Sequence, residues 1–470
     1  MPVPIRATFL GAFAVMFLAA AAFGASQQDR NTCDQASDPE QVIDACTRVI
    51  NDRKESSRNR RTALNHRGIA WHQKRDFARA LDDYNAALRL VPNDIDVLIN
   101  RAVTYRVMRD SDRAIREFDQ VLKRNLNNRG RLISYYNRAI AYHDKDDLER
   151  AIADFSQVIK IDPKDSDAYN GRGLAWSDKG EHDRAIADFS QAIKLDPQFA
   201  VAYVNRGDSW DDKGELDRAV ADFTRAIAID PELRRAFFLR GYVLVKKREL
   251  DRAIADFTEA IRIDRDYHLA YYHRGMAWAE KHDHDRSIAD YGEAIRLDPK
   301  NGDYLNSRCW ALAIANRDLQ QALGDCNESL RLRPNDPATL DSRGFVYLRL
   351  GRLNESIADY DARLKISPGN AYSLYGRGLA KLRSGDSARG DADIAAARAI
   401  NAGVADEFAR YGMAPGGAAT AAKPDCASAE THWKSALVLD ILAAYEDHLK
   451  RFPACAFATL AKARIKALQK

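Results

Sequence analysis

An internal repeat of 34 residues is the feature that most constrains how this chain folds. Arg-Gly pairs follow one another at this spacing and keep the same phase elsewhere; they begin at Arg67, Arg172, Arg206, Arg240, Arg274, Arg343 and Arg377. The run Ala-Ile-Ala-Asp-Phe and its variants also return once per repeat, and Asp-Pro closes several repeats. A fixed period in this range is typical of a solenoid of stacked helical hairpins.

The positions of small and aromatic residues within one repeat resemble those of the tetratricopeptide repeat. In residues 166–199 they are Tyr169 at position 4, Gly173 at 8, Trp176 at 11, Ala185 at 20, Phe189 at 24, Ala192 at 27 and Pro197 at 32. One departure recurs, because position 7 carries arginine where the family usually carries an aliphatic residue. The resemblance implies an all-α fold, a right-handed superhelical solenoid of helix-turn-helix repeats, with ten repeats over residues 61–404.

The repeat pattern also has a direct physical explanation. Small residues at positions 8 and 20 allow two antiparallel helices to approach closely, and the aromatic residues fill the space beside that contact. One hairpin cannot bury such a face, whereas a stack of hairpins buries a continuous core. The closing proline cannot continue a helix, so each repeat ends there. Two repeats are longer: the second, 95–131, has 37 residues and the eighth, 302–336, has 35.

The flanking segments differ from the repeats in composition. Residues 26–60 are expected to form an N-terminal capping helix that starts at Asp38-Pro39. Residues 405–425 include a Gly- and Ala-rich stretch that is typical of a linker. Residues 426–470 place Trp433, Tyr445 and Ile465 on apolar positions, which predicts a small C-terminal helical hairpin.

Residues 1–25 have the features of a signal peptide. Arg6 precedes an uncharged stretch over residues 7–23, and small residues near 22–25 offer a cleavage site. The stretch is Ala-rich and shorter than a stable membrane span prefers. We therefore expect cleavage, a periplasmic or secreted mature chain and no stable membrane insertion afterwards; retention as an anchor is the alternative.

The six cysteines form three local pairs along the sequence: Cys33 with Cys46, Cys309 with Cys326, and Cys426 with Cys455. Six cysteines allow several connectivities. Closeness in sequence, together with an oxidising compartment, favours disulfides within these pairs. A zinc site is disfavoured because the Cys-x-x-Cys spacing of structural sites is missing.

Catalytic and cofactor motifs are missing from the sequence. It has no phosphate-binding Gly-x-x-x-x-Gly-Lys, no His-Glu-x-x-His and no Gly-x-Ser-x-Gly. The tempting cluster His282-Asp283-His284-Asp285 falls on a predicted turn, where adjacent side chains point in different directions. Lys and Arg number 72 against 68 Asp and Glu, so no basic patch for nucleic acid is expected. The sequence predicts no enzyme activity, no cofactor and no metal.

Recurrent aspartates at position 23 are interpreted as structural. Asp188, Asp222, Asp256, Asp290 and Asp359 resemble a carboxylate array, but each recurs in the second helix of its repeat. We expect them to pair with the arginines at position 7, such as Arg172, Arg206 and Arg240, and so to stabilise the solenoid.

The functional surface is expected on the concave face, to which the resemblance assigns positions 2, 5, 9, 12 and 13. Repeats 4 and 5 place acidic residues there: Asp167, Asp178, Asp208, Asp211 and Asp212. Repeats 6 to 8 place apolar residues there: Phe238, Tyr242, Val245, Tyr272, Met276 and Trp310. Dense exposed aromatic residues commonly mark a binding surface. Superhelical coiling or the C-terminal hairpin could instead cover them.

These observations favour a scaffold in the cell envelope that binds a protein or peptide in its concave groove. The alternative is a regulatory or anchoring subunit of an envelope enzyme or secretion complex, contacted through the C-terminal hairpin. The Lys and Asn clamp with which chaperone-binding members of the family hold a carboxylate is missing, because position 9 carries Ile69, Leu174 and Trp310.

Overall fold

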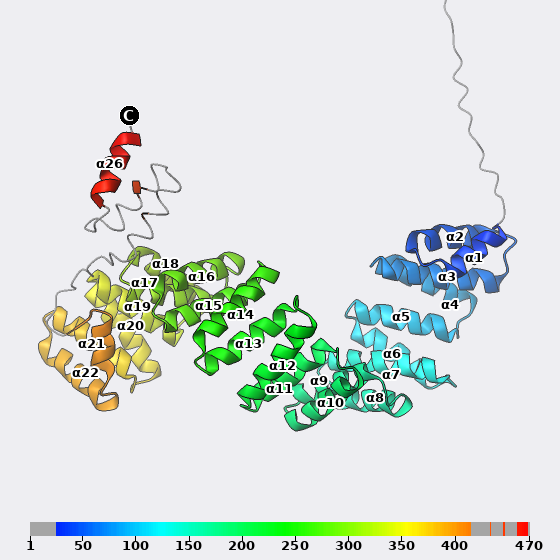
Figure 1. Ribbon diagram of the computed structural model, residues 1–470, viewed down its shortest axis with the longest axis horizontal. Coiled ribbons are helices and arrows are strands. Elements are labelled where there is room, and N and C mark those ends of the chain that lie inside the picture. The colour runs from blue at the N-terminus through cyan, green and yellow to red at the C-terminus, as the bar shows by residue number, and fades with distance from the viewer. Residues whose placement is uncertain (1–24, 415–432, 434–444, 447–457, 469–470) are drawn as a thin grey trace, which may run out of the picture. The chain divides into compact units, whose positions relative to one another are not determined.

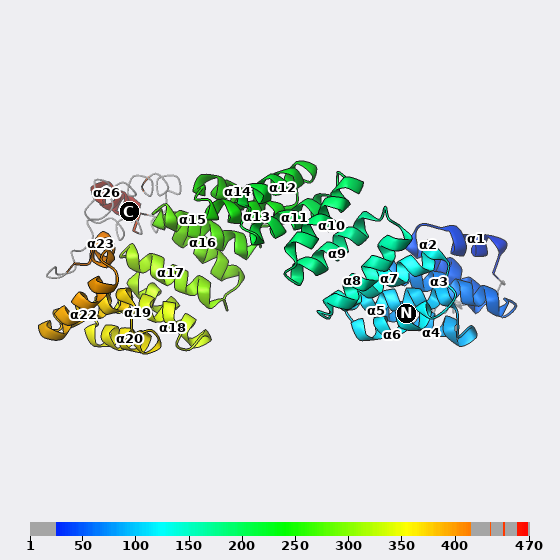
Figure 2. The same ribbon diagram turned by 90° about the horizontal axis from the view of Figure 1, so that it is seen from below.

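The computed structural model describes residues 25–414, 433, 445–446 and 458–468, and every regular element within these residues is an α-helix. The chain divides into two compact halves, residues 1–230 and 231–470, which are described separately. Within each half, consecutive helices lie side by side (Figures 1 and 2). Among the described helices, the extensive contacts join sequence neighbours and next neighbours, as expected for a stack of repeats.

The N-terminal half begins with a helical hairpin and continues with repeats 1 to 5. Its helices are α1 Gln27–Gln35, α2 Pro39–Asn51, α3 Ser57–Gln73, α4 Phe77–Leu90, α5 Ile95–Val107, α6 Ser111–Leu122, α7 Asn128–His143, α8 Leu148–Ile161, α9 Ser166–Asp178, α10 His182–Leu195, α11 Ala200–Asp212 and α12 Leu216–Ile229.

The C-terminal half contains repeats 6 to 10 and two further described helices. Its helices are α13 Arg234–Lys246, α14 Leu250–Ile263, α15 His268–Glu280, α16 His284–Leu297, α17 Gly302–Ile314, α18 Leu319–Leu332, α19 Pro337–Leu350, α20 Leu353–Ile366, α21 Ala371–Arg383, α22 Ser387–Ile400, α23 Val404–Arg410 and α26 Ala458–Leu468. In both halves the odd-numbered helix from α3 to α21 is the first of its repeat.

Glycine at position 8 lies against the aromatic ring at position 24, as the spacing predicts. A Cβ added to Gly173 would lie 2.7 Å from the Phe189 ring, and one on Gly207 would lie 2.8 Å from the Phe223 ring. Both rings are fully buried. A larger residue at position 8 would therefore push the two helices of a repeat apart.

The turn between the two helices of a repeat contains one residue in the left-handed region. Gly180 has φ 78°, and the equivalent His282 has φ 60° although it carries a side chain. Of the predicted cluster, His282 and Asp283 lie on this turn, whereas His284 and Asp285 begin α16. Asp283 caps α16 by accepting a hydrogen bond from the Arg286 amide, and Asp285 pairs with Arg317.

The expected pairing of position 7 with position 23 is confirmed. In both halves the arginine guanidinium donates two hydrogen bonds of 2.7 to 2.8 Å to the two carboxylate oxygens of an aspartate in the same repeat: Arg172 to Asp188, Arg206 to Asp222, Arg240 to Asp256, Arg274 to Asp290 and Arg343 to Asp359. A third nitrogen of Arg206 reaches Ser190 Oγ in the preceding repeat, 3.0 Å away. The arginine therefore ties its own helix pair together and joins it to its neighbour.

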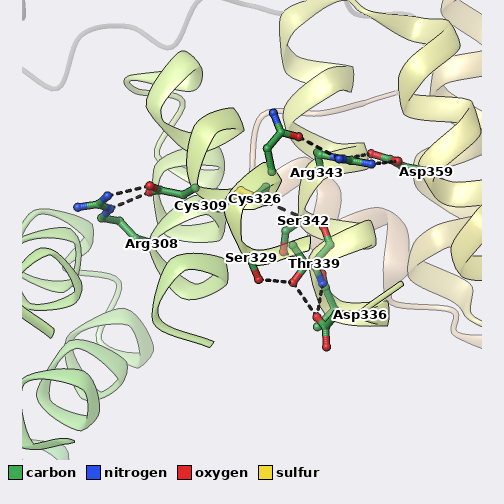
Figure 3. Close-up of a disulfide and its surroundings, with 12 residues drawn as sticks. Arg308, Cys309, Cys326, Ser329, Asp336, Thr339, Ser342, Arg343 and Asp359 are labelled. Carbon is green, nitrogen blue, oxygen red and sulfur yellow. Dashed lines mark hydrogen bonds and ion pairs between the residues drawn. A yellow bond between two sulfur atoms is a disulfide. The ribbon is translucent and has the colours of Figure 1, made fainter. Parts of the chain in front are cut away.

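Two cysteine pairs are joined in the structure. Cys33 and Cys46 connect α1 to α2, so the N-terminal cap is a two-helix hairpin rather than the single helix expected. Cys309 and Cys326 connect α17 to α18 (Figure 3). They occupy the positions at which other repeats place a glycine against a ring, so the covalent bond replaces that contact. The third predicted pair, Cys426 with Cys455, lies outside the described residues.

The chain after repeat 10 differs from the linker expected over 405–425. It forms α23, and Tyr411 to Ala414 follow this helix. Within the predicted C-terminal hairpin, the Trp433 and Tyr445 rings pack with their centroids 5.5 Å apart, and Ala461 and Ile465 of α26 pack against them.

Candidate functional site

The concave positions of repeats 6 and 7 form an aromatic cluster around His273. The ring centroids of Phe238, Tyr242 and Tyr272 lie 5.3 to 5.4 Å from the His273 ring centroid. Tyr242 keeps 36% of its surface exposed, and the Lys246 ammonium lies 4.6 Å from its ring centre. Val245 and Met276 are partly buried. The structure therefore brings Phe238, Tyr242 and Tyr272 together around His273.

The aromatic cluster is more buried than the sequence suggests. Burial alone lowers the pKa of His273 to about 4, so this ring is neutral at pH 7. Tyr272 packs on Tyr304, 4.6 Å between centroids, and also on Tyr291. Tyr272 is thus largely a packing residue. Among the large apolar residues of this surface, Tyr242 and Leu269 are exposed. Leu269 stands at position 2 of repeat 7 and is 37% exposed.

The acidic positions of repeats 4 and 5 lie in the N-terminal half and form contacts with histidines. His143 Nε2 lies 2.8 Å from Asp178 Oδ2, and His182 Nδ1 lies 3.6 Å from Asp212 Oδ2. Asp208 and Asp211 are partly buried and also engaged in interactions. Burial, followed by the charges of Asp165 and Asp196, raises the pKa of Asp167. These carboxylates form a polar surface in the N-terminal half, with two of them beside histidine rings.

Trp310 is covered by a segment that the sequence analysis assigned to a linker. We call residues 404–413 the strap. Tyr411 of the strap meets Trp310 with 5.6 Å between ring centroids, and Tyr372 and Phe345 enclose the same indole. The expectation that Trp310 lies in an open groove is therefore wrong, because α23 and the residues after it occupy that face.

The strap is the functional feature that sequence reasoning missed. Phe408 is fully buried against Phe345, Tyr372 and Tyr375. The apolar residues Val404, Phe408 and Tyr411 follow one another at helical spacing, and this pattern was the available signal. It is short and directly precedes a Gly- and Ala-rich stretch, which favoured the linker interpretation.

The only metal-type cluster within the described ranges lies between α1 of the N-terminal hairpin and α3 of repeat 1. Ligand atoms of Cys33, Asp34 and His66 lie within 4.8 Å of one another. Cys33 is bonded to Cys46, and a disulfide sulfur is not the thiolate that binds metal ions. This cluster therefore offers His66 and Asp34, 3.1 Å apart, as a surface pair.

Paired antiparallel helices, repeated at 34 residues and packed through neighbouring pairs, define an α-solenoid. Two sequence profiles described as tetratricopeptide repeat match the chain, one at 133–165 and 166–199 and the other at 53–95, 204–268, 238–302 and 274–337. Together they cover more than half of it. The chain belongs to the tetratricopeptide-repeat proteins. The unmatched second repeat forms the same helix pair, α5 and α6.

Solved structures with similar folds come from several repeat proteins. YrrB, described as a TPR protein with an unusual peptide-binding site, is 22% identical, with 40% of this chain and 97% of YrrB covered and a TM-score of 0.36. PilF of Pseudomonas aeruginosa is 17% identical, with 45% and 96% covered and a TM-score of 0.41. The Cut9–Hcn1 structure is 17% identical, with 80% of each chain covered and a TM-score of 0.41. No curated protein matches the chain.

None of the helices that the structure describes is long and apolar enough to cross a membrane.

Proposed function

We propose that this protein is a scaffold that binds a protein or peptide through the concave face of repeats 6 and 7. The observation that carries the proposal is the pair of exposed apolar residues, Tyr242 and Leu269, at concave positions of adjacent repeats above a packed aromatic base. Large apolar side chains on a rigid base serve as anchors because little side-chain entropy is lost on binding.

The family supports this proposal in general terms, because tetratricopeptide repeats are protein-interaction modules and the fold is generally not catalytic. We assign no reaction to the chain. The partner would place apolar anchors near Tyr242, and Lys246 beside that ring would favour a carboxylate or an aromatic group at the edge of the interface.

A double substitution tests the binding surface. Tyr242→Ala with Leu269→Ser should reduce partner recovery by at least tenfold in affinity purification from the native organism, with helicity and melting temperature preserved. Ile366→Ser is the matched control, because Ile366 is an apolar residue with 52% exposure at the end of α20, away from the concave positions. Equal recovery with both variants would exclude this surface.

The alternative role of the C-terminal hairpin is distinguished by truncation. A chain that ends at Ala414 keeps the repeats and the strap but lacks residues 415–470. The proposal expects this chain to retain the partner. If it loses the partner while the Tyr242 and Leu269 variant retains it, the anchoring function of the hairpin is the better description.

We further propose that the chain is exported and that cleavage leaves Ala25 as its first residue. Ala22 and Gly24 precede this bond as the third and first residues before it, and they offer the small side chains that a signal peptidase requires. The Ala25 nitrogen donates a hydrogen bond of 2.8 Å to Asp52 Oδ2, and a free ammonium there would form a charge-assisted pair. Intact-mass measurement of the protein recovered from its native cells should give a chain starting at Ala25; an uncleaved chain would contradict export by this route.

A further inference from the structure

The strap lies where the family's ligand-facing positions point. It contacts Trp310 at position 9 of repeat 8, Phe345 at position 9 of repeat 9, and Tyr372 and Tyr375 at positions 2 and 5 of repeat 10. Three consecutive repeats thus present their concave side chains to one short segment of the same chain. The strap occupies this face as a bound peptide would.

Arg349, at position 13 of repeat 9, lies under the end of the strap. Only 9% of its surface is exposed, and its guanidinium lies 5.2 Å from the Phe345 ring centre. It donates hydrogen bonds to two main-chain carbonyl oxygens, those of Tyr411 and of Ile314, the latter 3.4 Å away. Unlike the arginines at position 7, it meets no carboxylate among the described residues.

Two buried donors in this interface remain without acceptors. Neither Arg349 Nε nor the Tyr372 hydroxyl has a hydrogen-bond partner within the described part of the chain. Burial, together with the nearby charge of Arg383, lowers the pKa of Arg349 to about 10. A buried cation is normally paired with an anion and fully hydrogen-bonded. The strap therefore fills the apolar part of the site and leaves its charge unpaired.

We propose that the concave face of repeats 8 to 10 is a docking site for the C-terminus of a partner protein, and that the strap occupies it as an internal competitor. The partner would end in an aromatic residue with phenylalanine three residues earlier, as Phe408 and Tyr411 are spaced. The acceptor facing Arg349 is the main-chain carbonyl oxygen of Tyr411. In a chain that ends at the equivalent residue, this oxygen belongs to a carboxylate. A guanidinium–carboxylate pair, in which both partners are charged, is stronger than a hydrogen bond from a guanidinium to a neutral carbonyl oxygen. The strap lacks this charge, so such a partner can displace it.

This inference rests on the proposed scaffold function but concerns a different surface. The first test concerns repeats 6 and 7, and this one concerns repeats 8 to 10, so either can fail alone.

Labelled peptides of residues 401–411 provide the probe, one with a free carboxyl end and one amidated. The full chain carrying Phe408→Ala and Tyr411→Ala has a weakened strap. We expect the acid peptide to bind this variant at least tenfold more tightly than it binds the wild-type chain. On the variant, the acid peptide should also bind at least tenfold more tightly than the amide peptide. Adding Arg349→Gln should remove the difference between acid and amide.

A second version keeps every strap side chain in place. A protease site inserted between Ala402 and Gly403 is cut after folding, and the acid peptide should then exchange with the strap. Helicity and melting temperature report whether repeat 10 remains folded in both versions.

Three results would overturn the proposal. The first is equal binding of acid and amide peptides. The second is no peptide binding to either folded version, which would make the strap a structural cap. The third is concentration-dependent dimerisation of the variant in light scattering with no peptide uptake, which would make the strap of a second copy the occupant.

Discussion

At the scale of single residues, the arginine at position 7 is the main departure from the family pattern, and its geometry explains it. Arg206 holds both oxygens of Asp222 and also reaches Ser190 in the preceding repeat. Asp222 is only 6% exposed. The hydrogen bond to Asp222, which outweighs burial, raises the pKa of Arg206, so this guanidinium stays charged over the accessible pH range.

Removing one partner of this pair should be costly. Arg206→Leu leaves the Asp222 carboxylate buried without its two donors, and breaking a buried pair in this way costs about 3 kcal/mol or more. The double variant Arg206→Leu with Asp222→Leu should recover most of the loss, because no uncompensated charge remains. Urea unfolding followed by circular dichroism measures both. An unchanged midpoint for Arg206→Leu would show that the pair does not stabilise the repeat.

His273 should make the C-terminal half sensitive to acid. Its pKa in the folded chain is about 4, below its ordinary value of 6.5, because burial disfavours the charged ring. The unfolded chain therefore binds a proton at His273 more readily than the folded chain does. The contribution of the buried neutral ring to the free energy of unfolding is complete above pH 6.5 and is lost as the pH falls towards 4. The loss reaches about 3 kcal/mol.

His273→Phe removes this titration. The difference in unfolding free energy between pH 7 and pH 4.5 should be smaller in this variant than in the wild type, while buried carboxylates contribute equally to both. An identical pH dependence would mean that His273 is solvated or displaced in the native chain.

At the scale of elements, the sequence predicts helices and their pairing well because small and aromatic residues recur at fixed positions. The contact of Gly173 with Phe189 and the pairing of Arg172 with Asp188 follow directly from that spacing. The strap could not be predicted in the same way. Phe408 lies only four residues beyond repeat 10, and its partners come from repeats 9 and 10, so no local pattern identifies them.

In repeat 8 the disulfide between Cys309 and Cys326 takes the place of the usual contact between a glycine and a ring. This bond should stabilise the folded chain. The two residues are 17 apart in sequence. Closing a loop of this length contributes about 3 kcal/mol in the chain-entropy model. Compared with the oxidised wild type, the double variant Cys309→Ala with Cys326→Ala should lose this free energy of unfolding. Compared with the reduced wild type, it should lose none.

The matched variant restores the pattern of the other repeats. Cys309→Gly with Cys326→Phe should be more stable than the double alanine variant, because the ring covers the glycine as Phe189 covers Gly173. Thermal unfolding with and without reductant measures all three chains. Equal stability of the oxidised wild type and the double alanine variant would show that the bond adds nothing.

At the scale of the whole molecule, stability should be distributed along the chain. Helices contact their sequence neighbours and next neighbours, and each half has a buried core of its own. In such a stack the free energy of folding is approximately a sum of repeat and neighbour terms, so folding depends mainly on contacts within and between neighbouring repeats.

A cut at the boundary between the halves should therefore leave folded fragments. Residues 25–230 keep the disulfide-linked N-terminal hairpin, and residues 231–470 keep the strap, so each fragment retains one covered end. Each should show helical circular dichroism in proportion to its length and unfold cooperatively, at a lower temperature than the full chain.

A fragment ending at Gly214 is the control, since it retains α11 without α12. The apolar face that α12 buries is then exposed, and the contact of Gly207 with Phe223 is lost. It should lose more helicity than the removed residues account for. If the two long fragments were unfolded as well, stability would have to arise from cooperation across the full chain, contrary to a sum of neighbour terms.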